Sequence, residues 1–170
     1  MKTRTLALTL ILAAASASAQ APVVSKIDGA FGKKLGDVVE VGAERLVRGP
    51  EGLQYAVTFV PADGYPGLST FAVSVTPYSH KIFRVEASGT LPTAAAVENL
   101  RRTLELKYGP FVRFEDTATA ARWKFADGER SIVLTVADRL VRLFYTDDSL
   151  AATARIESTT GAAAADGKSL

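Results

Sequence analysis

The sequence predicts an α+β domain, in which an antiparallel sheet of about five or six strands packs on one main helix and a C-terminal helix follows. Two observations lead to this fold class. Several short runs, the first at residues 53–59, alternate apolar and polar residues as half-buried strands do, and turn-forming residues separate them. One longer segment, residues 92–108, instead spaces its apolar residues with the period of an α-helix.

The first 19 residues have the pattern of an export signal. Lys2 and Arg4 precede an apolar run over residues 6–12, and small residues follow, ending in Ala-Ser-Ala at 17–19. That run is too short to cross a bilayer, and no second apolar run reaches the length of a membrane span. We therefore expect a signal peptide cleaved near Ala19, a periplasmic or secreted mature chain, and no transmembrane segment.

Charge and cysteine content narrow the classes of function. The chain has 20 basic and 18 acidic residues, so loss of Lys2 and Arg4 with the signal would leave 18 basic against 18 acidic. A neutral chain gives no electrostatic reason to expect nucleic acid or an anionic membrane as a partner. Cysteine is absent, which excludes thiol catalysis, disulfides, a lipid-carrying cysteine and cysteine-bound metal. We expect no cofactor.

The length predicts a simple domain organisation. After the signal peptide at 1–19, the remaining length of about 150 residues suits one domain, which we place at residues 20–160. Residues 161–170 are rich in alanine and glycine. This composition predicts a disordered tail.

A hairpin is expected in the first half of the sheet, because residues 71–75 and 83–87 both alternate. Their apolar side chains share one face only if Val75 lies opposite Phe83. That register requires a loop of odd length, most simply Tyr78–His80.

The predicted helix has clear ends. Pro92 suits a first helical turn, Gly109 suits a C-terminal cap, and Pro110 prevents continuation. Glu98 precedes Arg102 by four residues, the order that favours an ion pair worth about 0.2–0.5 kcal/mol. The apolar stripe expected to face the sheet consists of Val97, Leu100, Leu104 and Tyr108.

Two tight turns join the last three predicted strands, at residues 121–125, 131–136 and 140–145. Asp127-Gly128 is a two-residue hairpin signal that would place Trp123 opposite Ile132. Asp138-Arg139 is a second such turn. The side chains expected to share the helix-covered face are Trp123, Ile132, Leu134, Val141, Leu143 and Tyr145.

The other face of these strands carries the candidate binding residues Arg122, Lys124, Arg142 and Phe144. Three cations beside an aromatic ring can bind a polyanion, but in a neutral exported chain they better fit a solvated outer face. Val133 and Phe144 are apolar residues on this same face. They favour contact with another protein or with the N-terminal segment.

Ser79 and His80 suggest an alternative, because they could serve as nucleophile and base of a small hydrolase. His80 is the only histidine. Adjacent residues on a tight loop seldom reach each other, and no orienting acid or oxyanion hole is marked. A turn histidine with a positive φ explains the pattern better.

Two further patterns have structural explanations. Residues 29–36 are rich in glycine and lysine, but their spacing is not that of a P-loop. We expect a glycine-rich turn there. Asp147 and Asp148 lack a third metal ligand at a useful spacing. They suit the positive end of a helix that runs from Asp147 through Ile156.

The chain carries a series of short motifs: Phe31-Gly32-x-x-Leu35-Gly36, Thr76-Pro77-x-x-His80-Lys81-Ile82, Leu104-Glu105-x-Lys107-Tyr108-Gly109, Trp123, Arg130-Ser131-Ile132 and Tyr145-x-Asp147. In this order they resemble a family of small bacterial periplasmic proteins of unassigned function. The resemblance covers most of residues 27–157. More loosely, the helix-plus-sheet layout is similar to β-lactamase-inhibitor-like domains.

The resemblance implies a module that binds proteins or serves envelope assembly, with no catalytic residues to carry over. Many members carry cysteines around the helix, whereas this chain has none. We therefore expect an exported protein that is not an enzyme and that binds a protein or envelope component, with an envelope protein as partner. The alternatives are the Ser79/His80 hydrolase and an inhibitor whose loop at residues 61–67 fills the active site of an exogenous enzyme. The oligomeric state stays open.

Overall fold

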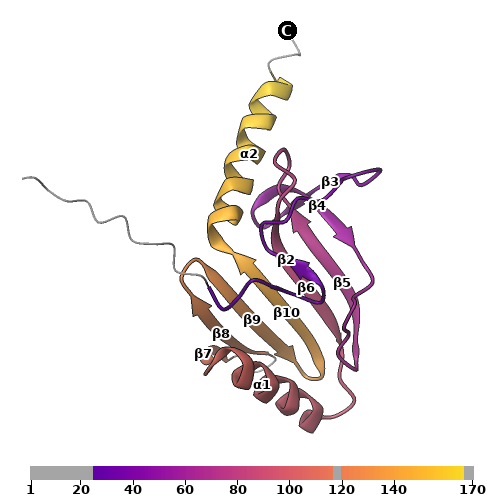
Figure 1. The fold of residues 1–170 in the computed structure, drawn as a ribbon, viewed down its shortest axis with the longest axis vertical. Coiled ribbons are helices and arrows are strands. Elements are labelled where there is room, and N and C mark those ends of the chain that lie inside the picture. The colour runs from indigo at the N-terminus through magenta and orange to yellow at the C-terminus, as the bar shows by residue number, and fades with distance from the viewer. Residues whose placement is uncertain (1–24, 117–119, 167–170) are drawn as a thin grey trace, which may run out of the picture.

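The computed structural model describes residues 25–116 and 120–166, and it describes the side chains of these residues except at 116 and 161–166. This part of the chain forms two helices, an eight-stranded antiparallel sheet and a two-stranded sheet (Figure 1). The predicted α+β class is confirmed, with more strands than the five or six expected. The predicted signal peptide lies outside the described residues.

The large sheet repeats one plan twice. Its strand order is β3-β4-β5-β6-β10-β9-β8-β7, so each half contains four strands that are consecutive in the chain. The first half leads into α1 (Ala94–Tyr108) and the second into α2 (Asp148–Asp166). The halves join where β6 pairs antiparallel with β10. The strands are β3 (Leu46–Gly49), β4 (Gly52–Thr58), β5 (Leu68–Val75), β6 (Ile82–Thr90), β7 (Val112–Asp116), β8 (Ala121–Asp127), β9 (Arg130–Ala137) and β10 (Leu140–Asp147).

The strands that the sequence did not predict lie mostly at the edges of the sheet. In β3, Leu46 and Val47 are adjacent and both exposed, so no alternation marks the strand. In β7, the register shifts between Arg113 and Glu115, which leaves Phe114 as an extra residue. Such a bulge breaks the two-residue period on which strand prediction depends.

The core lies between one face of the sheet and α1. Leu100, Leu104 and Tyr108 of α1 are buried in a single apolar cluster with the sheet. Figure 1 shows α1 across the lower end of the β7–β10 half and α2 extending beyond the upper end of the sheet. The face expected to meet the helix is confirmed, because the same cluster contains Ile132, Leu134, Val141, Leu143 and Tyr145, with Trp123 packed against it.

The ends of α1 follow from its caps. The Thr93 side chain accepts a hydrogen bond from the N–H of Ala96 at 3.1 Å, so the helix begins at Ala94, two residues later than predicted. Gly109 has φ 114°, a conformation that only glycine adopts readily, and it ends the helix as expected.

The ion pair predicted on α1 is wrong. Arg101, rather than Arg102, bonds to Glu98, and it also bonds to Glu105 on the next turn. Both spacings are favourable on a helix. One guanidinium can serve two carboxylates because it presents several donors, and the sequence spacing alone did not reveal this choice.

The β5–β6 hairpin departs from the predicted register only at its tip. Val73 lies opposite Val85, as expected, but Val75 lies opposite Ile82 rather than Phe83. A bulge absorbs the extra residue. Six residues, 76–81, separate the two strands, so the predicted odd-length loop Tyr78–His80 is wrong. Phe83 is the extra residue, and it packs with Ala151 and Ala154 of α2 instead of sharing the face of Val73 and Val85.

The β8–β9 turn lies one position later than predicted. Trp123 is opposite Leu134 rather than Ile132, so residues 128–129 form the turn. Gly128 has φ 62°, which suits glycine at the first central position of a type II′ turn. The pairing shifts by two residues, and the side chains therefore keep their predicted faces.

The N-terminal segment completes the same core. Ile27 and Leu35 are buried on the α1 side of the sheet, around the hairpin of β1 (Gly29–Ala30) and β2 (Lys33–Lys34). The Asp127 carboxylate accepts the N–H of Lys26 at 2.6 Å, and Arg130 donates to the carbonyl of Ile27 at 2.8 Å. These bonds fasten the segment to the β8–β9 hairpin. The glycine-rich turn expected at residues 29–36 is confirmed.

Helix α2 packs against β4, β6 and β10. Phe83, Ala151 and Ala154 form a second small core cluster. The Ser158 hydroxyl accepts the N–H of Leu53 at 2.7 Å, which ties the helix to the start of β4. Among the described residues, no helix is long and apolar enough to cross a membrane.

The ends of α2 differ from the prediction. Asp147 lies just before the helix, and its carboxylate accepts the N–H of Leu150 at 3.0 Å and pairs with Arg130. The helix continues to Asp166, well past Ile156. Its backbone thus includes residues 161–166 of the stretch predicted to be disordered, while 167–170 lie outside the described residues. Composition missed this because alanine, which dominates the stretch, is also the best helix former.

Two leucines on α1 provide a matched test of the core. Leu104 is 6% exposed and Leu106 is 85% exposed. Leu104→Ala should lower the free energy of unfolding by about 2–5 kcal/mol, because it leaves a cavity under the helix. Leu106→Ala should change it by no more than about 0.5 kcal/mol. Urea unfolding followed by circular dichroism measures both, and equal midpoints for the two variants would contradict this packing.

Candidate functional site

The pairing register places all four predicted binding residues on one face of the sheet, opposite α1. Arg122 of β8 and Arg142 of β10 both pair with Thr135 of β9, so these three residues form one row across the strands. The next row on the same face consists of Lys124, Val133 and Phe144. Neighbouring strands lie about 4.8 Å apart, which brings the three cations around Val133 and Phe144. We call this surface, with Arg84, the open sheet face.

The cations of the open sheet face differ in how they are paired. Arg122 forms a 2.6 Å ion pair with Glu115 of β7, and both side chains are exposed. Lys124 and Arg142 are also exposed, and neither forms an ion pair within the part of the chain that the structure describes. Their charge is therefore available to a partner.

The centre of the face is apolar and slightly hollow. Phe144 and Val133 are half-buried and line a cavity of ≈ 200 Å³ together with Arg84 and Thr146. The Arg84 guanidinium lies 5.8 Å from the centre of the Phe144 ring, within cation–π range. A side chain from a partner would meet an aromatic ring and a fixed guanidinium there.

Arg84 is held by a buried carboxylate. It bonds to Glu51 at 2.6 Å, and Glu51 is 7% exposed. Its second oxygen has no hydrogen-bond partner among the described residues. Arg155 of α2 approaches the first oxygen at 3.9 Å. The ion pair fixes the guanidinium under the Phe144 ring rather than leaving it mobile.

Sequence reasoning missed Arg84 and Glu51. The hairpin register already implied that Arg84 points away from the apolar face, so this residue could have been included. Glu51 carried no such signal, because it lies in the turn between β3 and β4. Only the folded sheet and α2 bring it to Arg84.

His80 adopts the positive φ predicted for a turn histidine, at 52°. Its ring packs edge-on against Tyr55, with ring centres 5.5 Å apart. The Ser79 hydroxyl donates to Glu157 at 2.5 Å and shares a hydrogen bond with Thr76 at 2.7 Å. Within the described residues no hydrogen bond joins Ser79 to the imidazole. The hydrogen bond from Ser79 to Glu157 attaches this loop to α2.

The two aspartates considered as metal ligands have structural roles. Asp147 caps α2, as described above, and Asp148 lies in its first turn. In the described part of the chain, no group of three histidine or acidic side chains is placed to hold a metal ion.

No protein-family model, curated protein or solved structure matches the chain in the three comparisons. The resemblance to small periplasmic proteins and to β-lactamase-inhibitor-like domains therefore stays a prediction.

The fastening of α2 to the Ser79 loop should depend on pH. Burial by itself raises the pKa of Glu157, but hydrogen bonds from the Ser79 hydroxyl and from the N–H groups of Tyr78 and Ser79 outweigh it and hold the pKa below the ordinary value of 4.5. A carboxyl group whose pKa is lowered by folding stabilises the fold at pH values above its unfolded-state pKa. That contribution is lost as the pH falls through the lower folded-state pKa.

Glu157→Gln should therefore be less stable than the parent chain at pH 7. The difference should shrink as the pH falls below about 4.5, because the parent carboxylate then becomes protonated. Thermal unfolding measured across this pH range tests the effect. Glu40→Gln is the control, since Glu40 is exposed and forms no hydrogen bond in the described residues. A gap that stays constant with pH would contradict the role given to the Glu157 carboxylate.

Proposed function

We propose that the protein is an exported, non-catalytic module that binds an envelope protein through the open sheet face. The observation that carries the proposal is the combination of Phe144 and Val133 with exposed Arg142 and Lys124 on the face opposite α1. The export pattern of residues 1–19 supports the location.

The composition of this face is that of a protein-binding surface. Interface centres are enriched in aromatic residues and arginine, and the residues that contribute most to affinity are often of these types. Phe144 and Arg84 meet this description at the centre, and exposed cations surround them. On the other face of the sheet, α1 and the N-terminal segment pack against the apolar side chains.

The partner surface should be acidic where it meets β8 to β10. Two of the four cations, Arg84 and Arg122, already have carboxylate partners. Lys124 and Arg142 supply the remaining positive charge. Glu86 of β6 pairs with Phe144 across the strands, so the negative charge lies on the β6 side. This charge arrangement would orient the partner on the sheet.

The partners of Ser79 support a non-catalytic role. Its hydroxyl bonds to Glu157 and Thr76, whereas a nucleophilic serine needs its base within hydrogen-bond reach. The Glu157 carboxylate joins the Ser79 loop to α2, which gives the loop a structural role.

Site-specific photocrosslinking in cells tests the proposal. A photoreactive residue at Thr135, in the middle of the open sheet face, should form a crosslink to a specific envelope protein. The same residue at Arg102, exposed on α1 and on the opposite side of the sheet, should not. Equal crosslinking from both positions, or none from Thr135, would contradict the assignment.

Substitutions on the face test its chemistry. Phe144→Asp should reduce affinity for the crosslinked partner by about thirtyfold or more, as loss of a central anchor does. Arg142→Glu should also weaken binding, whereas Arg102→Glu should not. Raising the salt from about 0.15 M to about 1 M shortens the screening length from roughly 8 Å to roughly 3 Å and should weaken binding further. Pull-down with the purified partner measures each effect.

A further inference from the structure

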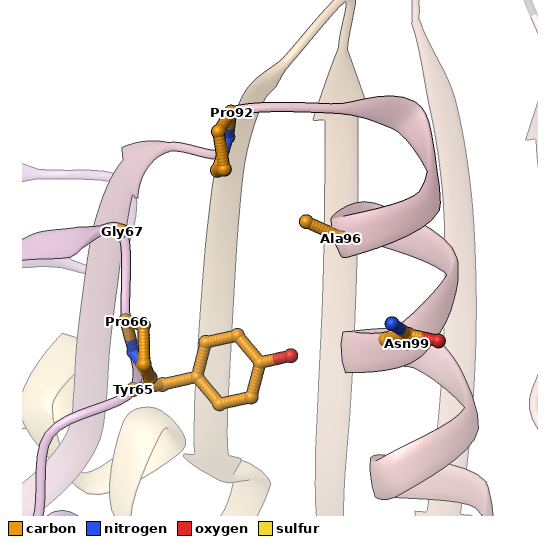
Figure 2. A pocket seen from close by; sticks show the side chains of 6 residues that line it. All are labelled: Tyr65, Pro66, Gly67, Pro92, Ala96 and Asn99. Carbon is orange, nitrogen blue, oxygen red and sulfur yellow. The ribbon is translucent and has the colours of Figure 1, made fainter.

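A separate groove lies on the α1 side of the sheet, between α1 and the loop at residues 61–67. Tyr65 of this loop points across toward α1 (Figure 2). On one side of Tyr65 is a cavity of ≈ 480 Å³ that also meets Pro92 and Asn99. On its other side is a cavity of ≈ 370 Å³, which we call the aromatic chamber. The groove therefore has two compartments with Tyr65 between them.

The wall formed by α1 is one face of the helix. Its lining residues are Ala96, Asn99, Leu100, Thr103, Leu104, Lys107 and Tyr108. Starting from Ala96, the set follows the i, i+3, i+4, i+7, i+8, i+11, i+12 pattern, in which residues three and four apart lie on the same side of a helix. The groove consequently follows α1 from its first turn to its last.

Aromatic rings form much of the chamber. Phe31 comes from the β1–β2 hairpin, Tyr65 from the loop, Tyr108 from the end of α1 and Tyr145 from β10. The ring centres of Tyr108 and Tyr145 are 6.0 Å apart. Burial raises the pKa of Tyr145, aided by the neighbouring Tyr108, so its hydroxyl stays neutral.

Phe31 is held in a strained backbone conformation. Its φ is 55°, which a bulky side chain rarely adopts. Phe31 and Gly32, with φ of 55° and 80°, are the two central residues of the turn between β1 and β2, and a type I′ hairpin turn requires a positive φ at both. The turn places the Phe31 ring edge-on to Phe71 and to Tyr145, at 5.1 and 6.2 Å between ring centres, and so shapes one wall of the chamber.

Two opposite charges line this apolar chamber. Asp63 comes from the loop and Lys107 from the last turn of α1. Both are exposed, and in the described residues neither forms an ion pair. The Lys107 ammonium lies 5.0 Å from the centre of the Tyr108 ring, at the edge of the aromatic lining. The chamber thus offers a carboxylate, an ammonium and aromatic rings.

We propose that the aromatic chamber binds a small hydrophobic zwitterion, an α-amino acid or dipeptide with an apolar side chain. Asp63 accepts its ammonium group and Lys107 binds its carboxylate, while the side chain enters between Phe31, Tyr65 and Tyr108. The volume fits this class, because ligand pockets span roughly 300–1,000 Å³ and this one lies near the lower end. The site is on the opposite side of the sheet from the open sheet face. Ligand binding in the chamber can therefore be tested independently of the proposed protein binding.

Calorimetric titration of the purified full chain tests the proposal. L-Phenylalanine and L-phenylalanyl-L-phenylalanine should bind saturably, and comparing them tells whether the amino acid or the dipeptide is preferred. N-Acetyl-L-phenylalanine amide, which has the same side chain without the charges, should bind about tenfold more weakly or worse. No saturation with either zwitterion up to roughly 10 mM would overturn the proposal, as would equal binding of the uncharged analogue.

Variants then locate the site. Asp63→Asn and Lys107→Gln should each weaken binding of the better zwitterion about tenfold, while Asp37→Asn and Lys26→Gln, which change exposed residues elsewhere, should not. Thr103→Trp, which places a large ring into the chamber from exposed Thr103, should block binding. Circular dichroism and thermal unfolding identify any variant that fails to fold. Unchanged binding in folded Asp63→Asn, Lys107→Gln and Thr103→Trp would overturn the assignment to this chamber.

Discussion

The pairing of β6 with β10 is the constraint on which the rest of the structure depends. It aligns Val85 with Tyr145 and Ala87 with Leu143, and so places the apolar sides of both half-sheets on one face. Side chains alternate along a strand, and a slip of one residue would turn every apolar side chain of one half to the opposite face. The common core under α1 and the open sheet face on the reverse side are two results of this one register.

The sequence predicted the elements whose side chains alternate between core and solvent. It identified most strands of the sheet and placed Arg122, Lys124, Arg142 and Phe144 on one face, because a period of two residues survives even a misplaced turn. It missed β3 and β7 because edge strands bury little and β7 contains a bulge. It also missed the pairing of Glu51 with Arg84 and the place of Asp63 and Lys107 in one cavity, since these residues come together only when distant turns, loops and helices pack.

The two faces of the sheet are built for different degrees of exposure. On the α1 side, most apolar side chains of the sheet are buried. The N-terminal hairpin packs on the part of this face that α1 does not cover. Beside Tyr65 two cavities remain. On the reverse side, polar bonds such as Arg84 to Glu51 position side chains that remain accessible. Removing one partner of such a pair would leave the other charge buried and unpaired.

The strand order has a consequence for how the chain folds. Within each half, neighbouring strands follow one another directly, so their loops close at little entropic cost. The β6–β10 seam instead joins strands that are far apart in sequence, with α1 and three other strands between them. Contacts of large sequence separation slow folding. We infer that the two meanders form first and dock last, and the seam is then the place where a partly folded chain stays open to pairing with another copy.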